Sequence, residues 1–507
     1  MGIKLKILIV ASEATPFAKE GGLADVTGAL SRELHRMGHD VRVVIPRYYK
    51  IDREKFGLKQ VGGVLGVPMG VIGTMDCAAL EGKMPGTEMP VYFIEHDRFF
   101  GSDGGFYSNK EGVGYIDNDN RMVFLSRAAL ELCRMIDFRP DVVHANDWHT
   151  AAIPVFLNTV YRDDQALGAA ASVLTIHNLQ HQGQFYEGLM DVLGVGWEHF
   201  NWRELEKDKE TNLLKGGIYH ANVITTVSES YAKEIQTPEF GFGLDGVLRD
   251  RAADLHGVIN GVDYDEWTPE KDKFIAKNYS AADIAGGLTG KAECKADLQR
   301  SVGLPVKPDV PVIGLVTRLV KQKGVDVLAE SVCTLLNYEV QVVLLGSGEV
   351  WAHFYFGDIP AKYPEKFACY IGYDNALAHK IEAGADFFLM PSLFEPCGLN
   401  QMYSLRYGTL PIVRATGGLN DTVENFNEAA LEGTGFIFHD LNSKAMLNTV
   451  GWALHTYYNR KDAMKALIGN AMKKRFTWAD SALRYEELYI RAVKNRLGDE
   501  EFAKRFG

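Results

Sequence analysis

Short apolar runs alternate with polar loops and amphipathic stretches along both halves of the chain. Near the N-terminus, the apolar run 5–11 predicts a buried strand, and apolar residues at helical spacing from Leu23 to Met37 predict a helix. A second apolar run, 41–45, follows the helix. Strand, glycine-containing loop, helix and strand form a βαβ unit, so the loop after the first strand is expected at the ligand-binding end of a sheet.

Polar residues recur where later apolar runs of the first half stop. Strands are predicted at 91–96, 141–144, 172–176 and 223–227, and a glycine-rich loop with Tyr107 spans 101–114. The residues that follow these strands include Asp147, His177 and Asn178. A single histidine after a strand is usually a core or capping residue. Polar residues at the ends of several strands together, however, predict a cleft.

The second half repeats the alternation of strands and helices. Strands are predicted at 312–316, 340–345, 367–371, 386–390 and 410–413, with helices at 325–336 and 400–407. This alternation predicts a second parallel sheet. The join lies near residue 263, ahead of a stretch with weaker patterning, and the amphipathic stretch 478–497 predicts a helix that could pack back onto the first half. We expect one domain over 1–262 together with 478–507, and another over 263–477.

One glycine motif occurs once in each half. Gly21-Gly22-Leu23 and Gly417-Gly418-Leu419 both lie between a predicted strand and a predicted helix. Adjacent glycines let the backbone approach a ligand closely, and Lys19 can supply a cation beside the first pair. Taken alone, the first loop is better explained as a plain turn with a solvated lysine. The matched context nevertheless predicts two similar α/β domains whose loops face one another across a cleft.

Composition limits the classes of partner. The chain has 507 residues, too many for one core, and a formal net charge of −12, which argues against nucleic acid or an anionic membrane. The six cysteines are scattered without a C-x-x-C or a Cys/His cluster, so neither a zinc site nor a disulfide framework is indicated. No signal sequence or apolar run long enough to span a membrane is recognised, so we expect a cytoplasmic protein acting on a neutral polymer or a small metabolite.

The turn 392–399 carries the most specific chemical signal. It follows the apolar run 386–390, precedes the helical run 400–407, and presents Glu395 at its mouth. Arg318 and Lys323 lie on another predicted turn and could stabilise a leaving diphosphate, although a basic surface turn is the plain alternative. Glu395 could recognise sugar hydroxyls and favour an oxocarbenium-like centre. Cys397 has no adjacent base and is expected to be a small buried apolar residue.

Two patterns are set aside as coincidental. Residues 241–246 match G-x-G-x-x-G but follow a predicted helix and Pro238, so the dinucleotide-binding context fails. The D-x-D patterns at Asp117 and Asp263 are common in turns and caps. No metal site is therefore predicted.

With these motifs in place, the chain resembles bacterial glycogen synthases and plant starch synthases, retaining glucosyltransferases with the two-Rossmann-domain architecture called GT-B. The resemblance covers nearly the whole chain. The matching motifs, in order, are Lys19–Val26, Asp147–His149, His177-Asn178, Asn260–Asp263, Thr317–Gly324, Ile371–Tyr373, Glu395–Leu399 and Thr416–Leu419.

The resemblance implies transfer of α-glucose from ADP-glucose to the non-reducing 4-OH of an α-1,4-glucan such as glycogen or a maltooligosaccharide, without metal or other cofactor. Glu395, Arg318, Lys323, His177 and Lys19 would be catalytic. Retention would come from front-face attack, with the leaving phosphate taking the acceptor proton, and the cleft would close around the donor to exclude water. The residues implied to bind substrate are Lys19, Gly21, Gly22, Asp25, Tyr107, Asp147, Asn178, Asn260, Tyr373, Cys397, Gly398, Leu399, Tyr403, Thr416, Gly417 and Gly418.

Two positions differ from the pattern common among GT-B enzymes. Many have a second glutamate, for the ribose, eight residues after the first; here that position is Tyr403, as in this family's own pattern. Residue 20 is glutamate where a smaller Thr or Val is expected, and it either points outward or alters donor preference. UDP-glucose therefore remains the alternative donor.

Two other classes of protein are weaker alternatives. An NAD-dependent oxidoreductase would need a strand-linked G-x-G-x-x-G, which the first loop lacks. A non-catalytic two-domain sugar-binding protein would explain a hinged cleft but not Arg318 together with Lys323.

Overall fold

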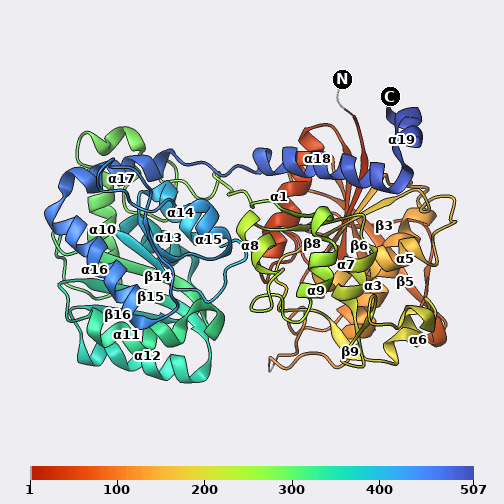
Figure 1. The fold of residues 1–507 in the computed structure, drawn as a ribbon, viewed down its shortest axis with the longest axis horizontal. Coiled ribbons are helices and arrows are strands. Elements are labelled where there is room, and N and C mark those ends of the chain that lie inside the picture. Colours follow the sequence, from red (N-terminus) through yellow and green to blue (C-terminus); the bar gives the residue numbers. More distant parts are fainter. Residues whose placement is uncertain (1–2, 111) are drawn as a thin grey trace. The chain divides into compact units, whose positions relative to one another are not determined.

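The computed structural model describes residues 3–110 and 112–507 (Figure 1). The chain divides into two compact units. Unit 1 comprises Met1–Val227, Ala232–Gly261 and Trp478–Gly507, and unit 2 comprises Ser228–Tyr231 and Val262–Thr477. The predicted loop 101–114 includes Glu111, which lies outside the described residues.

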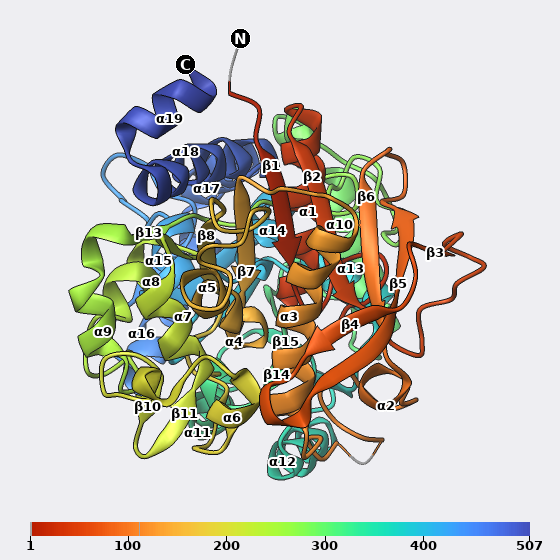
Figure 2. The ribbon, with the colours of Figure 1, turned by 90° about the vertical axis from the view of Figure 1, so that its right-hand side faces the viewer.

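Unit 1 is built on a 10-stranded sheet in the order β13-β12-β8-β7-β1-β2-β6-β5-β3, with β4 paired to β5 (Figure 2). The pairings from β13 to β6 are parallel, whereas β3, β4 and β6 each pair antiparallel with β5. The strands are β1 (Lys6–Val10), β2 (Asp40–Pro46), β3 (Lys59–Gln60), β4 (Leu65–Pro68), β5 (Thr74–Lys83), β6 (Pro90–Glu95), β7 (Val142–Asn146), β8 (Ala171–Ile176), β12 (Val223–Thr226) and β13 (Leu255–Gly257). A separate sheet in the order β10-β11-β9 holds β9 (Gln184–Tyr186), β10 (Glu206–Lys207) and β11 (Glu210–Asn212).

The helices of unit 1 cover both faces of its large sheet. α1 leads from β1 to β2, whereas α3 leads from β6 back past β1 to β7, so right-handed crossovers place these helices on opposite faces. The helices of residues 1–261 are α1 (Gly22–Arg36), α2 (Asp97–Phe100), α3 (Asn118–Met135), α4 (Asp147–Thr150), α5 (Ala152–Asn158), α6 (Leu189–Leu193), α7 (Leu213–His220), α8 (Glu229–Glu234) and α9 (Asp245–Asp250).

The C-terminal helix α18 (Trp478–Leu497) belongs to unit 1 and is followed by α19 (Asp499–Phe506). The Tyr489 hydroxyl of α18 lies 2.8 Å from Nδ1 of His144 in β7. The Ser481 hydroxyl donates to the carbonyl of Ile259 at 2.8 Å. Apolar residues at helical spacing on α18, including Tyr485 and Leu488, are buried.

Unit 2 contains a six-stranded, wholly parallel sheet in the order β16-β15-β14-β17-β18-β19. Its core contains buried apolar residues of the sheet together with residues of the surrounding helices. The strands are β14 (Val312–Leu319), β15 (Gln341–Gly348), β16 (Phe367–Ile371), β17 (Phe387–Met390), β18 (Leu410–Arg414) and β19 (Phe436–Phe438). The helices are α10 (Thr289–Ser301), α11 (Val325–Leu335), α12 (Val350–Lys362), α13 (Asn375–Gly384), α14 (Asn400–Tyr407), α15 (Gly417–Thr422), α16 (Ser443–Asn459) and α17 (Lys461–Lys473).

Two strands of unit 2 are longer than predicted. We placed Thr317 and Arg318 in a turn and ended the next strand at Leu345, but β14 and β15 remain paired to Leu319 and Gly348. The pairing needs Gly346 and Gly348, because a side chain on either would press into a carbonyl oxygen of β14. These glycines therefore permit close strand pairing where we read them as the end of the strand.

Candidate active site

The predicted turn 392–399 follows β17 and leads into α14, as expected. Its carboxylate, Glu395, is buried. The ammonium of Lys323 lies 2.8 Å from Oε1 and 2.6 Å from Oε2 of Glu395. The Ser392 hydroxyl also donates to Oε2, at 3.0 Å. The carboxylate is therefore held in one orientation from two sides.

The second predicted cation, Arg318, lies near the carboxyl end of β14 and is exposed. Its Nη2 donates to Oε1 of Gln322 at 3.2 Å. Lys323 closes the short 3₁₀ helix η5 (Lys321–Lys323) directly after the same strand. Both cations thus lie at the strand ends of a parallel sheet, where such sheets bind ligands.

The second glycine pair packs on the Glu395 turn. Gly418 donates its N–H to the carbonyl of Glu395 at 3.0 Å. Gly417 has φ +45°, and a side chain on either glycine would press into the carbonyl of Glu395 or Cys397. These glycines are therefore required for the two loops to meet, in addition to any approach of a ligand. Thr416 is buried at the N-cap of α15.

The remaining residues predicted in unit 2 differ in accessibility. Cys397 is buried, Gly398 has φ +70°, and Leu399 is the N-cap of α14. Tyr373 is 78% exposed, and its hydroxyl donates to Oδ1 of Asn375. Tyr403 instead stacks on Trp267, with ring centroids 4.1 Å apart.

In unit 1, the loop after β1 is organised by Glu13, a residue that we did not single out. Its Oε2 accepts the backbone N–H of Glu20 at 2.6 Å and of Gly21 at 3.0 Å. Its Oε1 accepts the hydroxyl of Tyr107 at 3.0 Å. Burial raises the pKa of the Glu13 carboxyl, while the N–H donors and Tyr107 oppose the rise. Glu13 follows a strand end, as the other predicted polar residues do, and that position was the available signal.

The charged residues of this loop form their own pair. Nζ of Lys19 lies 2.8 Å from Oδ1 of Asp25. A side chain on Gly22 would meet no atom within 4 Å, so this glycine leaves open space at the start of α1. The Glu20 side chain is exposed.

Three predicted residues of unit 1 meet at the ends of β7 and β8. Oδ1 of Asp147 accepts the backbone N–H of His177 at 2.7 Å and of Asn178 at 3.4 Å. Burial raises the pKa of Asp147 to about 7, against the effect of these two donors. Nε2 of His177 lies 3.0 Å from Oδ1 of Asn146, and burial lowers the pKa of His177 to about 3, so the imidazole is neutral at physiological pH.

Asn260 is buried in unit 1, and its Oδ1 has no hydrogen-bond partner within residues 3–110 and 112–507. A buried amide oxygen without a partner costs free energy. This atom is therefore suited to accept a hydrogen bond from a ligand hydroxyl.

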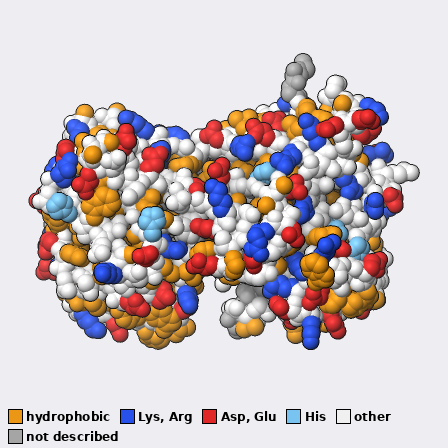
Figure 3. Space-filling model, in the orientation of Figure 1, with side chains coloured by type: hydrophobic (Ala, Val, Ile, Leu, Met, Phe, Trp, Pro, Cys, Tyr) orange, Lys and Arg blue, Asp and Glu red, His pale blue; other side chains and the backbone are white. Residues whose placement is uncertain are grey.

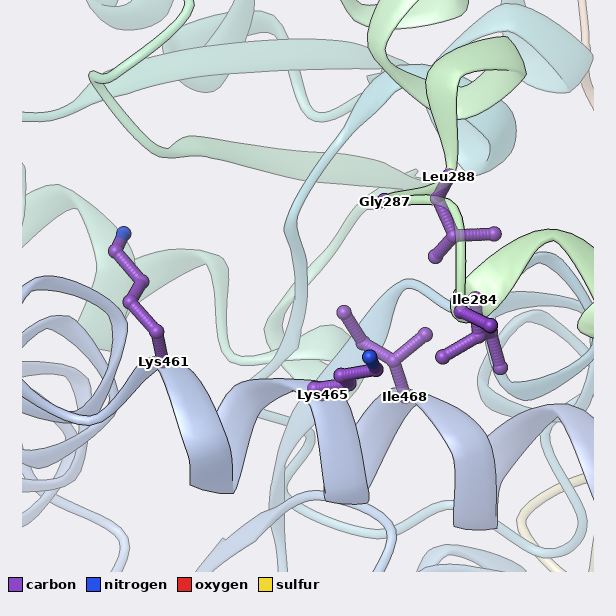
Figure 4. Close-up of a pocket in the computed structure, with 7 residues that line it drawn as sticks. Ile284, Gly287, Leu288, Lys461, Lys465 and Ile468 are labelled. Atoms are coloured by element: carbon purple, nitrogen blue, oxygen red, sulfur yellow. The ribbon is translucent and has the colours of Figure 1, made fainter.

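A cavity of about 320 Å³ lies elsewhere in unit 2, between α17 and the segment 284–288. In Figure 4, Ile468 and Lys465 extend from α17 toward Ile284 and Leu288. None of the residues predicted to bind substrate lines it.

Two observations concern the surface of the chain. Acidic and basic side chains are interspersed on the face drawn in Figure 3. In the part of the chain that the structure describes, no helix combines the length and apolar character needed to cross a membrane.

Comparisons with known proteins agree with this architecture. Residues 6–250 match the family described as starch synthase catalytic domain, and residues 300–473 match glycosyl transferases group 1. The proteins named glycogen synthase 1 from Geobacter metallireducens and Geobacter sulfurreducens are each 64% identical over 504 residues, with 99% of both chains covered.

A solved structure supports the same conclusion. The catalytic domain of starch synthase IV from Arabidopsis thaliana, bound to ADP and acarbose, is 33% identical, with a TM-score of 0.87 over 97% of this chain and 100% of that one. Sucrose-phosphate synthase from Thermosynechococcus elongatus shares the fold, at 14% identity and a TM-score of 0.55 over 95% of this chain and 98% of that one. The predicted resemblance and fold class are therefore confirmed: the chain belongs to the glycogen synthase and starch synthase family of GT-B glycosyltransferases.

Proposed function

We propose that this glycosyltransferase extends an α-1,4-glucan by transferring the α-glucosyl group of ADP-glucose to the 4-OH of the non-reducing end, with retention. The observation that carries the proposal is the cluster of Arg318, Lys323 and Glu395 at neighbouring strand ends of unit 2. In this assignment, unit 2 binds the nucleotide sugar and unit 1 binds the glucan.

The two cations act on the leaving group. As the bond between C1 of glucose and the diphosphate oxygen breaks, negative charge grows on the diphosphate. The guanidinium of Arg318 can hold phosphate oxygens in a bidentate manner, and the ammonium of Lys323 acts as a compact charge. These fixed charges can stabilise the leaving diphosphate, so we propose that the reaction needs no metal or other cofactor.

Glu395 acts on the glucosyl group. Its oxygens accept hydrogen bonds from glucose hydroxyls, and its negative charge favours the positive charge that develops at C1. Lys323 contacts both oxygens of Glu395 and is the residue that links the sugar to the diphosphate.

The α configuration at C1 is retained because the acceptor hydroxyl attacks C1 from the same face that the diphosphate leaves. The acceptor oxygen forms its bond to C1 as the bond to the diphosphate breaks, and the acceptor proton passes to the departing diphosphate oxygen. No enzyme nucleophile is needed, which is consistent with the buried position of Cys397. Neutral His177, ordered by Asn146, is proposed to hydrogen-bond the sugar.

The choice of ADP-glucose rests on relatives. The Arabidopsis starch synthase IV was solved with ADP and acarbose, a nucleotide and an oligosaccharide. Tyr373, exposed in unit 2, is proposed to stack on the base. The exposed position of Glu20 supports the view that its charge does not alter the donor site. A cytoplasmic location fits the substrates.

The test is release of nucleoside diphosphate with a maltooligosaccharide acceptor, with ADP-glucose and UDP-glucose supplied separately and with chelator present. Turnover and chain growth with ADP-glucose, with an α-configured new bond by NMR, is the expected result. Preference for UDP-glucose would keep the mechanism but overturn the donor assignment. Absence of release from either donor would overturn the proposal.

A further inference from the structure

Three side chains that serve no step of the glucosyl transfer converge in unit 1. His199 ends the 3₁₀ helix η2 (Trp197–His199), Glu204 lies in the turn that follows, and His220 ends α7. Nδ1 of His199 lies 2.6 Å and Nε2 of His220 lies 3.0 Å from the same atom, Oε2 of Glu204. These three ligand atoms lie within 4.8 Å of one another, which no other group of three His, Cys, Asp or Glu does among the residues that the structure describes.

We propose that His199, Glu204 and His220 bind a divalent transition-metal ion, for which Zn²⁺ is the best fit. Two imidazole nitrogens and one carboxylate oxygen are a ligand set typical of zinc, with a water molecule in the fourth position. The proposal does not depend on the proposed function. It revises the expectation from sequence, where no C-x-x-C or Cys/His cluster was recognised and no zinc site was indicated.

The distances suit this ion after a small adjustment. With zinc–ligand bonds of about 2.0–2.1 Å, ligand atoms in a tetrahedral site lie about 3.3 Å apart. The present separations of 2.6 and 3.0 Å therefore need to open by less than 1 Å, and the two imidazole nitrogens, now within 4.8 Å of each other, need to reach the same spacing. Rotation of the carboxylate can supply this change.

The surroundings of the cluster orient its carboxylate. Nδ2 of Asn201 donates to Oε1 of Glu204 at 3.1 Å, which leaves Oε2 directed at the two imidazoles. Outer partners of this kind commonly fix metal ligands. The side chains of His199, Glu204 and His220 are 23, 15 and 7% exposed, so an ion can enter from solvent.

The helix end at His220 also favours a cation. The carbonyl groups at the C-terminus of α7 give it a partial negative charge. The neighbouring cation, Arg251, is already engaged: it donates to the carbonyl of Ile218 at 2.7 Å and of Ala221 at 2.6 Å, and to Asp254 at 3.1 Å.

A metal at this point would connect the segment 197–206 to α7. Figure 2 shows β10, which begins at the end of this segment, and β11 near α7. The buried Lys215 of α7 already joins the two parts by donating to the carbonyls of Trp202 and Glu206. The ion would strengthen this connection and raise the unfolding temperature as the free metal concentration rises above the dissociation constant.

The proposal is tested on the full chain after treatment with chelator. Zn²⁺ is titrated in competition with a chromophoric chelator, thermal unfolding is followed with and without Zn²⁺, and Co²⁺ is added to obtain an absorption spectrum. The test variants are His199→Asn and His220→Gln. The amide nitrogens of Asn and Gln can replace Nδ1 and Nε2 as hydrogen-bond donors to Glu204, but they are poor zinc ligands.

We expect one Zn²⁺ per chain, a higher unfolding temperature with Zn²⁺, and a tetrahedral Co²⁺ spectrum. Each variant should fold and should bind Zn²⁺ at least about 100-fold more weakly than the parent. Its unfolding temperature should no longer rise when Zn²⁺ is added. His455→Ala, at an exposed position of α16, is the matched control and should bind as the parent does. Failure of the parent to bind at micromolar Zn²⁺, or equal binding by both variants, would overturn the proposal and leave a hydrogen-bonded structural cluster.

Discussion

Lys323 reaches from the turn after β14 to the carboxylate of Glu395 after β17 and contacts both of its oxygens, at 2.8 and 2.6 Å. The two side chains are 19 and 6% exposed, so the pair is largely shielded from water. A diphosphate that binds Lys323 must share this cation with Glu395. The pair thus couples a residue proposed to bind glucose to one proposed to bind phosphate.

Replacing Lys323 by Gln is expected to lower kcat/KM by about 100-fold or more, because the leaving diphosphate loses a fixed charge. Initial rates of ADP release, measured with saturating glucan, test this. Lys321→Gln is the matched control, because Lys321 is exposed on the same turn. Equal losses in both variants would mean that the general charge of the turn matters and not the position of Lys323.

Glu395→Gln separates two roles of the carboxylate. If Glu395 only orients Lys323, its removal leaves the ammonium available to phosphate and activity survives. We expect a fall in kcat of at least about 100-fold, because the glucosyl group also loses its negative partner. Binding of ADP, measured by calorimetry, should remain or strengthen. Weaker ADP binding together with normal kcat would contradict the proposed contact with glucose.

The two glycine pairs should respond differently to a methyl group. Gly418→Ala forces a Cβ into the carbonyl of Cys397, so we expect a loss of stability of roughly 1–3 kcal/mol and low activity. Gly22→Ala meets no atom within 4 Å and should fold normally. If substrate approaches this backbone closely, the Gly22 variant will show a raised KM at an unchanged unfolding temperature. An unchanged KM would show that no ligand needs the space.

Glu13→Gln should loosen the loop after β1. The oxygen of the Gln amide can keep both N–H groups of Glu20 and Gly21, but its nitrogen replaces the oxygen that accepts from Tyr107, and all three contacts lose the carboxylate charge. We expect a loss of about 1–3 kcal/mol in unfolding free energy and a lower kcat/KM, both measurable on one preparation. Glu20→Gln, which changes an exposed side chain, should alter neither quantity. If Glu13→Gln changes neither the unfolding free energy nor kcat/KM, the loop is held by other contacts.

Periodicity identified the elements that surround the site. The predicted bounds of α14, β16 and α18 match the structure. β16 and α18 have clear apolar patterns, whereas the bounds of the more polar α14 follow from the turn before it and from Gly408 after it. The antiparallel strands β3, β4 and β5 were not predicted. β5 combines alanines, a glycine and charged residues, so its place in the sheet depends on pairing with β4 and β6 and not on its own propensity.

Contacts between distant segments could not be predicted in the same way. The sequence favoured Glu395 and Lys323 separately, but their ion pair depends on the adjacency of β14 and β17, which a linear pattern does not specify. Glu13 was missed because its partners lie as far away as Tyr107. His199, Glu204 and His220 meet only because α7 packs against the preceding turn, so their spacing carries no recognisable motif.

Asp147 should make stability depend on pH in a defined direction. Burial raises its pKa in the folded chain to about 7, from an ordinary value of 3.8. Below about pH 4 the carboxyl is protonated in both folded and unfolded chains. Between pH 4 and 7 the unfolded chain releases this proton while the folded chain retains it, so rising pH favours unfolding.

The comparison variant is Asp147→Asn, which keeps an oxygen for the N–H groups of His177 and Asn178 and tolerates the φ of 54° at this position. Relative to this variant, the parent should lose up to about 4 kcal/mol of unfolding free energy between pH 4 and 7, with no further change above. Denaturant unfolding at a series of pH values measures the unfolding free energy of both proteins. Because both contain His177, its titration cancels when one free energy is subtracted from the other. Asp163→Asn, at an exposed position, should show no such slope. If the difference in unfolding free energy between the parent and Asp147→Asn does not change from pH 4 to 7, the carboxylate is already ionised in the folded chain. The N–H donors of His177 and Asn178 would then outweigh the effect of burial on its pKa.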